Sequence, residues 1–501
     1  MTALEVGSVA GPFDQSRQRF EAVIDFLEGD EATALQHADL EDALQSDARE
    51  LFCLLFQDHL DLRALTEERL VVADSDGASH GAVEAGHERV LTTIFGEVTV
   101  SRLAYRRRGH QNLHPADAAL NLPEERHSHG LRRLAAIESS RGSFGGSVDA
   151  ISRVTGVEVG KRQAEELTRR AAADFEAFYA SRSQTQGKKG AVLVVSCDGK
   201  GIVMRPGGLR PATAKAAARA NNKLETRLSR GEKRNRKRIA EVGAVYDLEP
   251  VPRTPADVLA SGSGDATPKP APKASNKWVT ASVVDDAAQV IGRLFDEGER
   301  RDPEHKRCWV ALVDGNQHQI DRIHAEAKAR GLTIPIVIDF VHVLEYVWKA
   351  AWSFFCEGDP AAEVWVHDTL LAILQGDARQ VAASIRRKAT TRRMSLAERK
   401  GADTCATYLT NKAAYLDYPT ALAAGWQIAT GVIEGACRFL VADRMDITGA
   451  RWSVDGAEAV LKLRALRSNG DFDAYFSFHL AQERRRVHES RYANGVIPRA
   501  A

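Results

Sequence analysis

Three acidic residues, Asp198, Asp314 and Glu434, stand where an isolated carboxylate is energetically unfavourable. Asp198 follows a β-branched apolar run, Asp314 follows a second such run, and each is succeeded by glycine. An acid at the end of a buried strand usually holds a cation or a substrate, because burying an unpaired charge costs free energy. An Asp-Gly pair also fits a β-hairpin turn, so neither residue is decisive alone. The recurrence of the arrangement favours one shared site.

Glu434 lies in a third apolar stretch, 431–445, whose pattern is helical. Three carboxylates from separate segments can hold two Mg²⁺ or Mn²⁺ ions about 3.5–4 Å apart, which activates one oxygen and stabilises the departing one in phosphoryl transfer. Hard oxygen ligands favour these ions over zinc. Asp339 also ends a buried apolar run, so Asp198, Asp339 and Glu434 form an alternative triad.

These acids need a sheet and helices to bring them together. The apolar periodicities predict the order strand, strand, strand, helix, strand, helix, strand, helix. The expected strands cover 191–195, 202–204, 239–246, 308–313 and 334–338, and the helices between the later strands cover 285–299 and 317–330. This order resembles the α/β ribonuclease H-like fold, whose acids come from the first strand, the fourth strand and a later helix. The resemblance favours Asp314 over Asp339 as the second acid.

Charge is strongly segregated, although the formal net charge of the 501 residues is zero. Residues 1–50 carry twelve Asp and Glu against three Lys and Arg, and residues 205–238 carry twelve Lys and Arg against two Glu. Such a basic run repels itself unless a polyanion is present, which indicates contact with a nucleic-acid backbone. The residues expected to make this contact are Lys233, Arg234, Arg236 and Lys237.

A helix-turn-helix pattern lies upstream of the sheet. Residues 147–154 and about 159–170 are helical in pattern and flank a short turn containing Gly156. The second helix of such a motif can enter the major groove of DNA, with Lys161, Arg162 and Gln163 near its N-terminal end. Many helix pairs have this shape without binding DNA. A β-hairpin over 88–108, ending in three arginines, precedes the motif.

The remaining patterns set the domain organisation. No apolar run approaches the about 20 residues that span a bilayer, no secretion signal opens the chain, and the six cysteines form no CxxC pair, so an intracellular protein is expected. The expected parts are an acidic helical region (1–85), a small β-hairpin element (86–125), a helix-turn-helix-like DNA-binding domain (126–185), the first part of the catalytic core (190–344, with a basic loop at 205–238 and a linker at 261–276), an all-helical insertion (345–425), the second part of the core (426–480) and a C-terminal tail (481–501).

Four segments carry a resemblance to a known family. The chain resembles the DDE-type insertion-sequence transposases of bacteria, closest to the ISKra4 group and related to the ISL3 and Mutator-like enzymes. The segments are VVSCDGKG (194–201), VALVDGN (310–316), IPIVIDFVHVLEYVW (334–348) and GVIEGACRFLVADRMDITGARWSVDGAEAVLKLRAL (431–466). The stretch at 93–108 extends the resemblance upstream.

The resemblance implies a function and further site residues. It implies cleavage of transposon-end DNA by water and transfer of the 3′-OH to target DNA, by a homodimer or higher homo-oligomer in the bacterial cytoplasm at the nucleoid, with Mg²⁺ or Mn²⁺ and no small-molecule cofactor. Asp339 and His342 match supporting residues of such families. Residues expected to contact DNA near the Glu434 helix are Arg438, Arg444, Arg451 and Trp452, and a place in the protein core is the alternative for Trp452. A nuclease without strand transfer and a domesticated DNA-binding protein are the alternatives.

Overall fold

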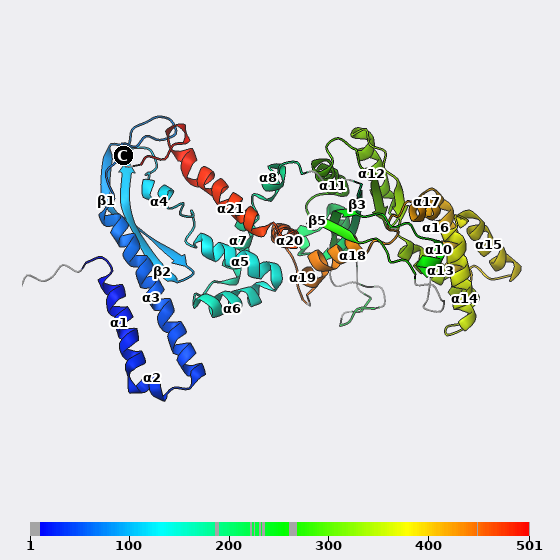
Figure 1. Cartoon of the computed structure of the whole chain (residues 1–501), viewed down its shortest axis with the longest axis horizontal. Coiled ribbons are helices and arrows are strands. Elements are labelled where there is room, and N and C mark those ends of the chain that lie inside the picture. The colour runs from blue at the N-terminus through cyan, green and yellow to red at the C-terminus, as the bar shows by residue number, and fades with distance from the viewer. Residues whose placement is uncertain are drawn as a thin grey trace, which may run out of the picture. The chain divides into compact units, whose positions relative to one another are not determined.

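The computed structural model describes residues 11–185, 190–220, 223–224, 226–229, 232, 236–259, 268–447 and 449–499 (Figure 1). The chain divides into two compact units. Unit 1 comprises the described residues up to Ala180 together with those from Asp471 onward, and unit 2 is Ser181–Gly470. The polypeptide therefore leaves unit 1, forms the whole of unit 2, and returns. The expected end of the core at 480 is wrong by about one helix, because 471–480 pack in unit 1.

Unit 1 combines helices with one antiparallel hairpin. Its elements are α1 (Asp14–Glu28), α2 (Asp30–Ala34), α3 (His37–Leu65), β1 (Ala82–Thr93), β2 (Gly96–Arg106), α4 (Pro115–Ala119), α5 (His129–Arg141), α6 (Phe144–Thr155), α7 (Lys161–Ala171), α8 (Phe175–Ala180) and α21 (Phe472–Glu483). The long α3 lies along β2, and the core between them contains Leu60, Leu91 and Val98. Gly96, with φ 135°, opens the second strand where a side chain would collide with Cys53.

The C-terminal segment is an integral part of unit 1. Arg132 on α5 is fully buried, and its Nη1 donates to Glu483 Oε2 on α21 at 2.8 Å. His479, also on α21, bonds Asp174 Oδ2 through its Nδ1 at 2.6 Å. The Tyr475 hydroxyl donates to the carbonyl of Ala171 at 2.7 Å. These buried polar contacts fix α21 against the helices of the helix-turn-helix region.

Unit 2 is a mixed α/β structure built on a five-stranded sheet. The strands are β3 (Val192–Val203), β4 (Lys237–Leu248), β5 (Ala274–Ser282), β6 (Trp309–Val313) and β7 (Ile336–Ile338). Their order in space is β5-β4-β3-β6-β7. The pairs β5–β4 and β4–β3 are antiparallel, and the pairs β3–β6 and β6–β7 are parallel. The order of elements along the chain, three strands and then alternating helices and strands, agrees with the expectation.

Two strand assignments differ from the sequence expectation. The strands expected at 191–195 and 202–204 are one continuous strand, β3, in which Asp198 pairs with Val242 and Gly199 with Glu241. Asp198-Gly199 is therefore not a hairpin turn. The third strand of the sheet, β5, begins inside the expected linker 261–276, of which 261–267 lie outside the described residues. Its signal was weak because two of its inward residues, Thr280 and Ser282, are polar yet fully buried.

Helices cover the sheet and extend unit 2. They are α9 (Pro211–Ala218), α10 (Pro255–Leu259), α11 (Ala287–Arg301), α12 (Gln317–Ala329), α13 (Phe340–Phe354), α14 (Pro360–Leu374), α15 (Ala378–Thr391), α16 (Lys400–Lys412), α17 (Tyr418–Ala423), α18 (Gly431–Ala436), α19 (Asp443–Met445) and α20 (Val454–Ser468), with a π-helical turn η3 (Cys437–Ala442) after α18. The insertion expected at 345–425 is helical throughout its regular elements, and α13 to α17 gather together in Figure 1. The expected basic loop contains a helix, α9.

Two tyrosines of the helical insertion donate hydrogen bonds to the backbone at the ends of the short parallel strands β6 and β7. The hydroxyl of Tyr408 on α16 donates to the carbonyl of Asp314 at 3.3 Å. The hydroxyl of Tyr418 on α17 donates to the carbonyl of Ile338 at 2.9 Å. Tyr408 also stacks on Tyr346 of α13, with ring centroids 3.9 Å apart. The insertion thus fixes the backbone at the positions where Asp314 and Asp339 leave the sheet.

Candidate active site

Strand register brings the first two acids together. The parallel pairing of β3 with β6 matches Leu193 to Trp309 and Val195 to Ala311. The Ser196 hydroxyl donates to the carbonyl of Leu312 at 2.6 Å, so the association continues toward the strand ends. The same offset places Asp198 level with Asp314. Neighbouring strands lie about 4.8 Å apart, and residues at one level point to the same face, so the two carboxylates are neighbours at the carboxyl end of β6.

The face onto which Asp198 projects follows from its neighbours. A side chain at Gly243 would collide with Leu294, so this glycine faces α11. Gly243 pairs with Cys197, and alternation along the strand turns the next residue, Asp198, to the opposite face. On that face the Cys437 thiol donates to Asp198 Oδ2 at 3.4 Å. The Asp198 carboxylate is half-buried, and its Oδ1 accepts the N–H of Gly199 at 2.6 Å.

Glu434 reaches the same face through its helix. It lies on α18 one turn before Cys437, and residues three apart on a helix are neighbours on its surface. Because Cys437 contacts Asp198, Glu434 lies one helical turn from that contact. The expectation that apolar residues surround it is wrong: Ile433 and Leu440 are buried, whereas Glu434 is exposed. The Glu434 carboxylate is thus open to solvent.

Asp339 lies level with Asp314, but its carboxylate accepts hydrogen bonds from a backbone N–H and a side-chain hydroxyl. The β6–β7 register matches Val313 to Ile338, so the next residues, Asp314 and Asp339, are adjacent. Asp339 is fully buried, and its Oδ1 caps α13 by accepting the N–H of Val341 at 2.8 Å. Its Oδ2 accepts the hydroxyl of Thr430. Both oxygens of Asp339 are thus engaged within the protein, whereas solvent reaches the carboxylate of Asp314.

The site has an excess of negative charge. Burial raises the pKa of the Asp314 carboxyl; the hydrogen bond from the Asn316 N–H opposes this rise, and the charge of Asp198 adds to it. Burial likewise raises the pKa of the Cys437 thiol, again with a contribution from Asp198. His342 is the one expected supporting residue that brings a compensating group: its Nε2 lies 4.0 Å from Asp314 Oδ2. Mutual repulsion of this kind is relieved when cations bind between carboxylates.

The three expected acids do not form a compact group of ligands for one ion. Among the described residues, the triad does not bring three ligand atoms within 4.8 Å of one another. Two ions about 3.5–4 Å apart take ligands from different carboxylates, so the outer oxygens of such a site need not converge on one point. The groups that could hold two ions are the carboxylates of Asp198, Asp314 and Glu434.

The four residues expected to contact DNA near Glu434 differ in exposure. Arg438 and Arg451 are exposed, and the Arg438 side chain is 82% accessible. Arg444 and Trp452 are buried and stacked on each other, with the guanidinium carbon 4.6 Å from the ring centroid. The Trp452 indole N–H donates to the carbonyl of Met445 at 3.1 Å. Burial leaves neither side chain exposed for the expected contact of Arg444 with phosphate or of Trp452 with a base, and it agrees with the core alternative for Trp452.

The expected basic contacts of the 205–238 loop are only partly described. Lys233 and Arg234 lie outside the described residues. Lys237 opens β4, is exposed, and places its Nζ 3.6 Å from Asp446 Oδ1. Arg236, just before the strand, is half-buried. Of the four expected residues, the structure describes Arg236 and Lys237. Both lie where β4 begins, and β4 pairs with β3, the strand that carries Asp198.

The helix-turn-helix expectation is confirmed as a shape. Helix α6 ends at Gly156, whose φ of 71° suits glycine, and α7 follows at Lys161. Lys161 and Arg162 are exposed at the start of α7. Gln163 is exposed too, but its Oε1 accepts the N–H of Gly160 at 2.9 Å. Gln163 therefore caps α7 with its side-chain oxygen. The other two expected DNA-binding residues, Lys161 and Arg162, take no part in this hydrogen bond.

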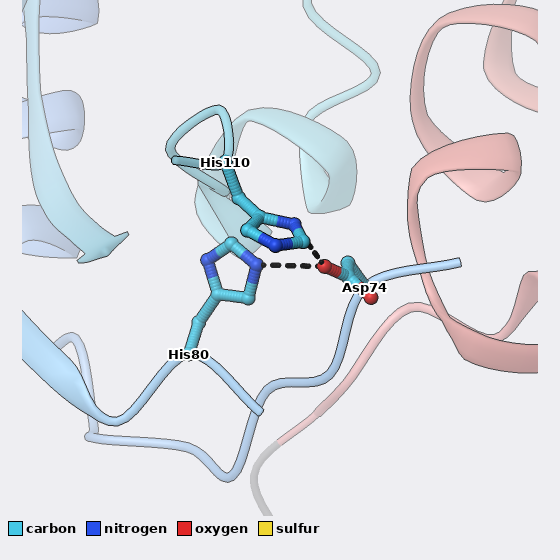
Figure 2. Close-up of side chains that lie close together, drawn as sticks. All are labelled: Asp74, His80 and His110. Atoms are coloured by element: carbon cyan, nitrogen blue, oxygen red, sulfur yellow. Dashed lines mark hydrogen bonds and ion pairs between the residues drawn. The ribbon is translucent and has the colours of Figure 1, made fainter. Parts of the chain in front are cut away.

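A second cluster, which the sequence did not reveal, lies in unit 1 (Figure 2). Asp74, His80 and His110 bring three ligand atoms within 4.8 Å of one another, so this group could hold a metal ion. It is the one such group of three or more among the described residues. Asp74 and His80 precede β1 and His110 follows β2, so no short motif announces them. Only the pairing of the hairpin brings them together.

No protein-family model matches the chain, and a search of curated proteins gave no match. Among the described residues, every helix is too short or too polar to cross a membrane. The six cysteines are all free thiols. What the chain does must therefore be argued from its own geometry.

Proposed function

We propose that the chain is a DDE-type insertion-sequence transposase, in which a ribonuclease H-like unit 2 cuts the ends of the element and joins them to target DNA. The observation that carries the proposal is the register of β3 with β6, which brings Asp198 level with Asp314, together with the contact of Asp198 with Cys437, one helical turn after Glu434. The sheet order supports it, since the strand that carries Asp198 lies beside the strand that Asp314 follows.

The three acids have distinct tasks in this proposal. Asp198, which is half-buried and level with Asp314, would be the shared ligand of two Mg²⁺ or Mn²⁺ ions. Asp314, whose backbone Tyr408 fixes, and Glu434, exposed on α18, would each complete one side. The ions, when bound, supply the means to activate a nucleophilic oxygen and to stabilise the departing one. An all-oxygen donor set that repels itself fits these hard cations.

His342 is placed to orient Asp314 rather than to hold an ion. Its Nε2 faces the Asp314 carboxylate at 4.0 Å, while its Nδ1 is buried without a hydrogen-bond partner among the described residues. A histidine beside a carboxylate ligand can fix the orientation of that carboxylate, as partners around metal ligands commonly do. Asp339 acts one step further back, because it holds Thr430 and the start of α13.

The partner in this proposal is DNA. Arg438 and Arg451 are exposed in the segment that carries Glu434, and Lys237 is exposed on β4. Lys161 and Arg162 present two further cations at the start of a helix-turn-helix second helix in unit 1. Contacts to phosphate from such residues give affinity that falls steeply with salt. Assembly as a homodimer or higher homo-oligomer on paired ends, in the bacterial cytoplasm at the nucleoid, belongs to the same proposal.

The test is a cleavage and strand-transfer assay on the DNA that flanks the coding region. With Mg²⁺, the protein should nick the element's ends and join the 3′-OH to a target plasmid. Asp198→Asn and Glu434→Gln should each lower the rate by about 10³-fold or more, since loss of a metal ligand removes several kcal/mol of transition-state stabilisation. Glu345→Gln is the matched control, because Glu345 is an exposed acid of the same unit that forms an ion pair with Lys349 on its own helix.

The products separate the proposal from its alternatives. Nicking without joined product identifies a nuclease of the same fold. Binding of the ends with neither reaction identifies a DNA-binding protein that has lost catalysis. A cleavage rate that survives Asp198→Asn while Glu345→Gln is equally active would show that the chemistry lies elsewhere in the chain.

A further inference from the structure

The cluster of Asp74, His80 and His110 converges on one carboxylate oxygen. Asp74 Oδ2 lies 3.1 Å from His80 Nε2 and 2.9 Å from His110 Nδ1 (Figure 2). Asp74 and His80 are buried, and His110 closes the group from the solvent side, with 36% of its side chain accessible. Two imidazole nitrogens and one carboxylate oxygen, all within 4.8 Å of one another, are a set of ligand types that binds zinc in proteins.

The atoms behind this oxygen orient the cluster. Asp74 Oδ1 accepts the N–H of Ala78 at 2.8 Å and the N–H of Asp76 at 3.0 Å. These two bonds hold the carboxylate so that Oδ2 points toward the histidines. Backbone contacts that orient a ligand in this way are characteristic of metal sites.

The hydrogen bonds of His80 leave one ring nitrogen in need of a cation. Its Nδ1 lies 3.1 Å from the carbonyl oxygen of Tyr105, which can only accept a proton. Its Nε2 faces Asp74 Oδ2, which is also an acceptor. A neutral imidazole has one hydrogen for these two acceptors, so the contact to Asp74 needs either a second proton or a metal ion. The Tyr105 carbonyl fixes the tautomer that leaves Nε2 free to bind a metal.

We propose that Asp74 Oδ2, His80 Nε2 and His110 Nδ1 bind a divalent transition-metal ion, with Zn²⁺ as the best fit, and that water completes a tetrahedral site. Zinc bonds of about 2.0–2.2 Å to nitrogen and oxygen place tetrahedral ligand atoms roughly 3.3–3.5 Å apart. The separations of 2.9 and 3.1 Å need to widen by only a few tenths of an ångström. Imidazole nitrogen favours zinc over the hard cations proposed for the acids of unit 2.

Such an ion would join three segments of unit 1. Asp74 and His80 lie in the segment before β1, His110 lies just after β2, and Asp74 forms a β-bridge with Tyr492 of the C-terminal segment. The N–H of Ala493 adds a bond to the carbonyl of Ala73 at 3.2 Å. The ion would therefore close the base of the hairpin and hold the returning chain there. Its role is structural, and it does not depend on the function proposed for unit 2.

The test measures zinc binding by the untagged full-length chain. The background variant Asp198→Asn weakens binding at the acids of unit 2. Competition with a chromophoric chelator should show one Zn²⁺ per chain, and Co²⁺ should give the visible absorption of a tetrahedral site with nitrogen and oxygen ligands. His110→Gln should weaken binding at least 10-fold and abolish the rise in thermal midpoint that Zn²⁺ causes. His110 is exposed, so its replacement should leave the fold, followed by circular dichroism, intact.

His87→Gln is the matched control. His87 also faces a carboxylate, with its Nε2 3.4 Å from Glu84 Oε2, but it belongs to no group of three. It should bind Zn²⁺ as the parent does. Absence of saturable binding in the parent, or equal affinity in the folded His110→Gln and His87→Gln variants, would overturn the proposal and identify the cluster as a hydrogen-bonded clasp that needs no ion.

Discussion

Replacing Asp314 and Asp339 one at a time distinguishes a residue needed for DNA cleavage from a residue needed for stability. The two acids are adjacent in the strand register, but they differ in their contacts. We expect Asp314→Asn to abolish DNA cleavage without loss of stability. Burial raises the pKa of the Asp314 carboxyl in the folded protein. An acid whose pKa rises on folding stabilises the fold only while protonated, and this contribution is lost as pH rises through the folded pKa. At neutral pH its charge therefore opposes folding, and its removal should be neutral or stabilising.

For Asp339→Ala we expect the reverse, a loss of stability. Asp339→Ala removes the cap of α13, at about 0.5–2 kcal/mol. It also leaves the buried Thr430 hydroxyl without its acceptor, at about 1–3 kcal/mol. The sum, roughly 1.5–5 kcal/mol, corresponds to a fall in thermal midpoint of about 3–20 °C, at the about 2–4 °C per kcal/mol that is typical of large domains. Asp339→Asn keeps a cap acceptor and supplies an amide that can donate to Thr430, so it should retain both stability and most activity.

The assay pairs urea unfolding with nicking of labelled terminal DNA for the same preparations. The expected pattern is an inactive, stable Asp314→Asn and an active Asp339→Asn. The opposite pattern, in which Asp314→Asn cuts DNA and a stably folded Asp339→Asn does not, would refute the assignment of Asp314 and make Asp339 the ligand. Both variants inactive and stable would show that the two acids share the task.

Three further outcomes follow from the contacts. Arg444→Ala should destabilise unit 2 by about 2 kcal/mol or more, because it removes a desolvated cation–π contact. Arg451 is exposed, so Arg451→Ala should weaken DNA binding and leave the midpoint of urea unfolding unchanged. Burial opposes ionisation of Asp174, but hydrogen bonds from a histidine and an arginine outweigh it and lower its pKa to about 2. The stability that this carboxylate contributes is present above its ordinary pKa of about 3.9 and is lost as pH falls toward 2, so Asp174→Asn should flatten the acid limb of the stability profile. Arg162→Ala should reduce the salt dependence of binding to terminal DNA by about one unit of slope; an unchanged slope would remove α7 from the interface.

The sequence was most informative where buried strands end. The runs before Asp198 and Asp314 were read correctly as strands, because continuous β-branched runs bounded by glycine have few other structures. The mistake at Asp198-Gly199 arose from the same residues, since Asp-Gly suits a hairpin turn as well as a long strand that carries a ligand. Only the pairing with β4 decides between them.

Other features depend on contacts that no local pattern encodes. Arg444 and Trp452 were expected to contact DNA because they lie near the Glu434 helix in the sequence, but they pack against each other in the core. The partner of Asp198, Cys437, was missed because a cysteine at helical spacing from an acid carries no signal of its own. The cluster at Asp74 was missed because its histidines come from opposite ends of a hairpin.

The most direct test of the central claim is a crystal structure of the full chain with terminal DNA and Mn²⁺, read by the anomalous scattering of manganese. The account predicts two anomalous peaks about 3.5–4 Å apart, both touching Asp198, with Asp314 at one and Glu434 at the other. Peaks held by other residues, or a DNA phosphate bound far from Asp198 with no manganese beside it, would contradict the account.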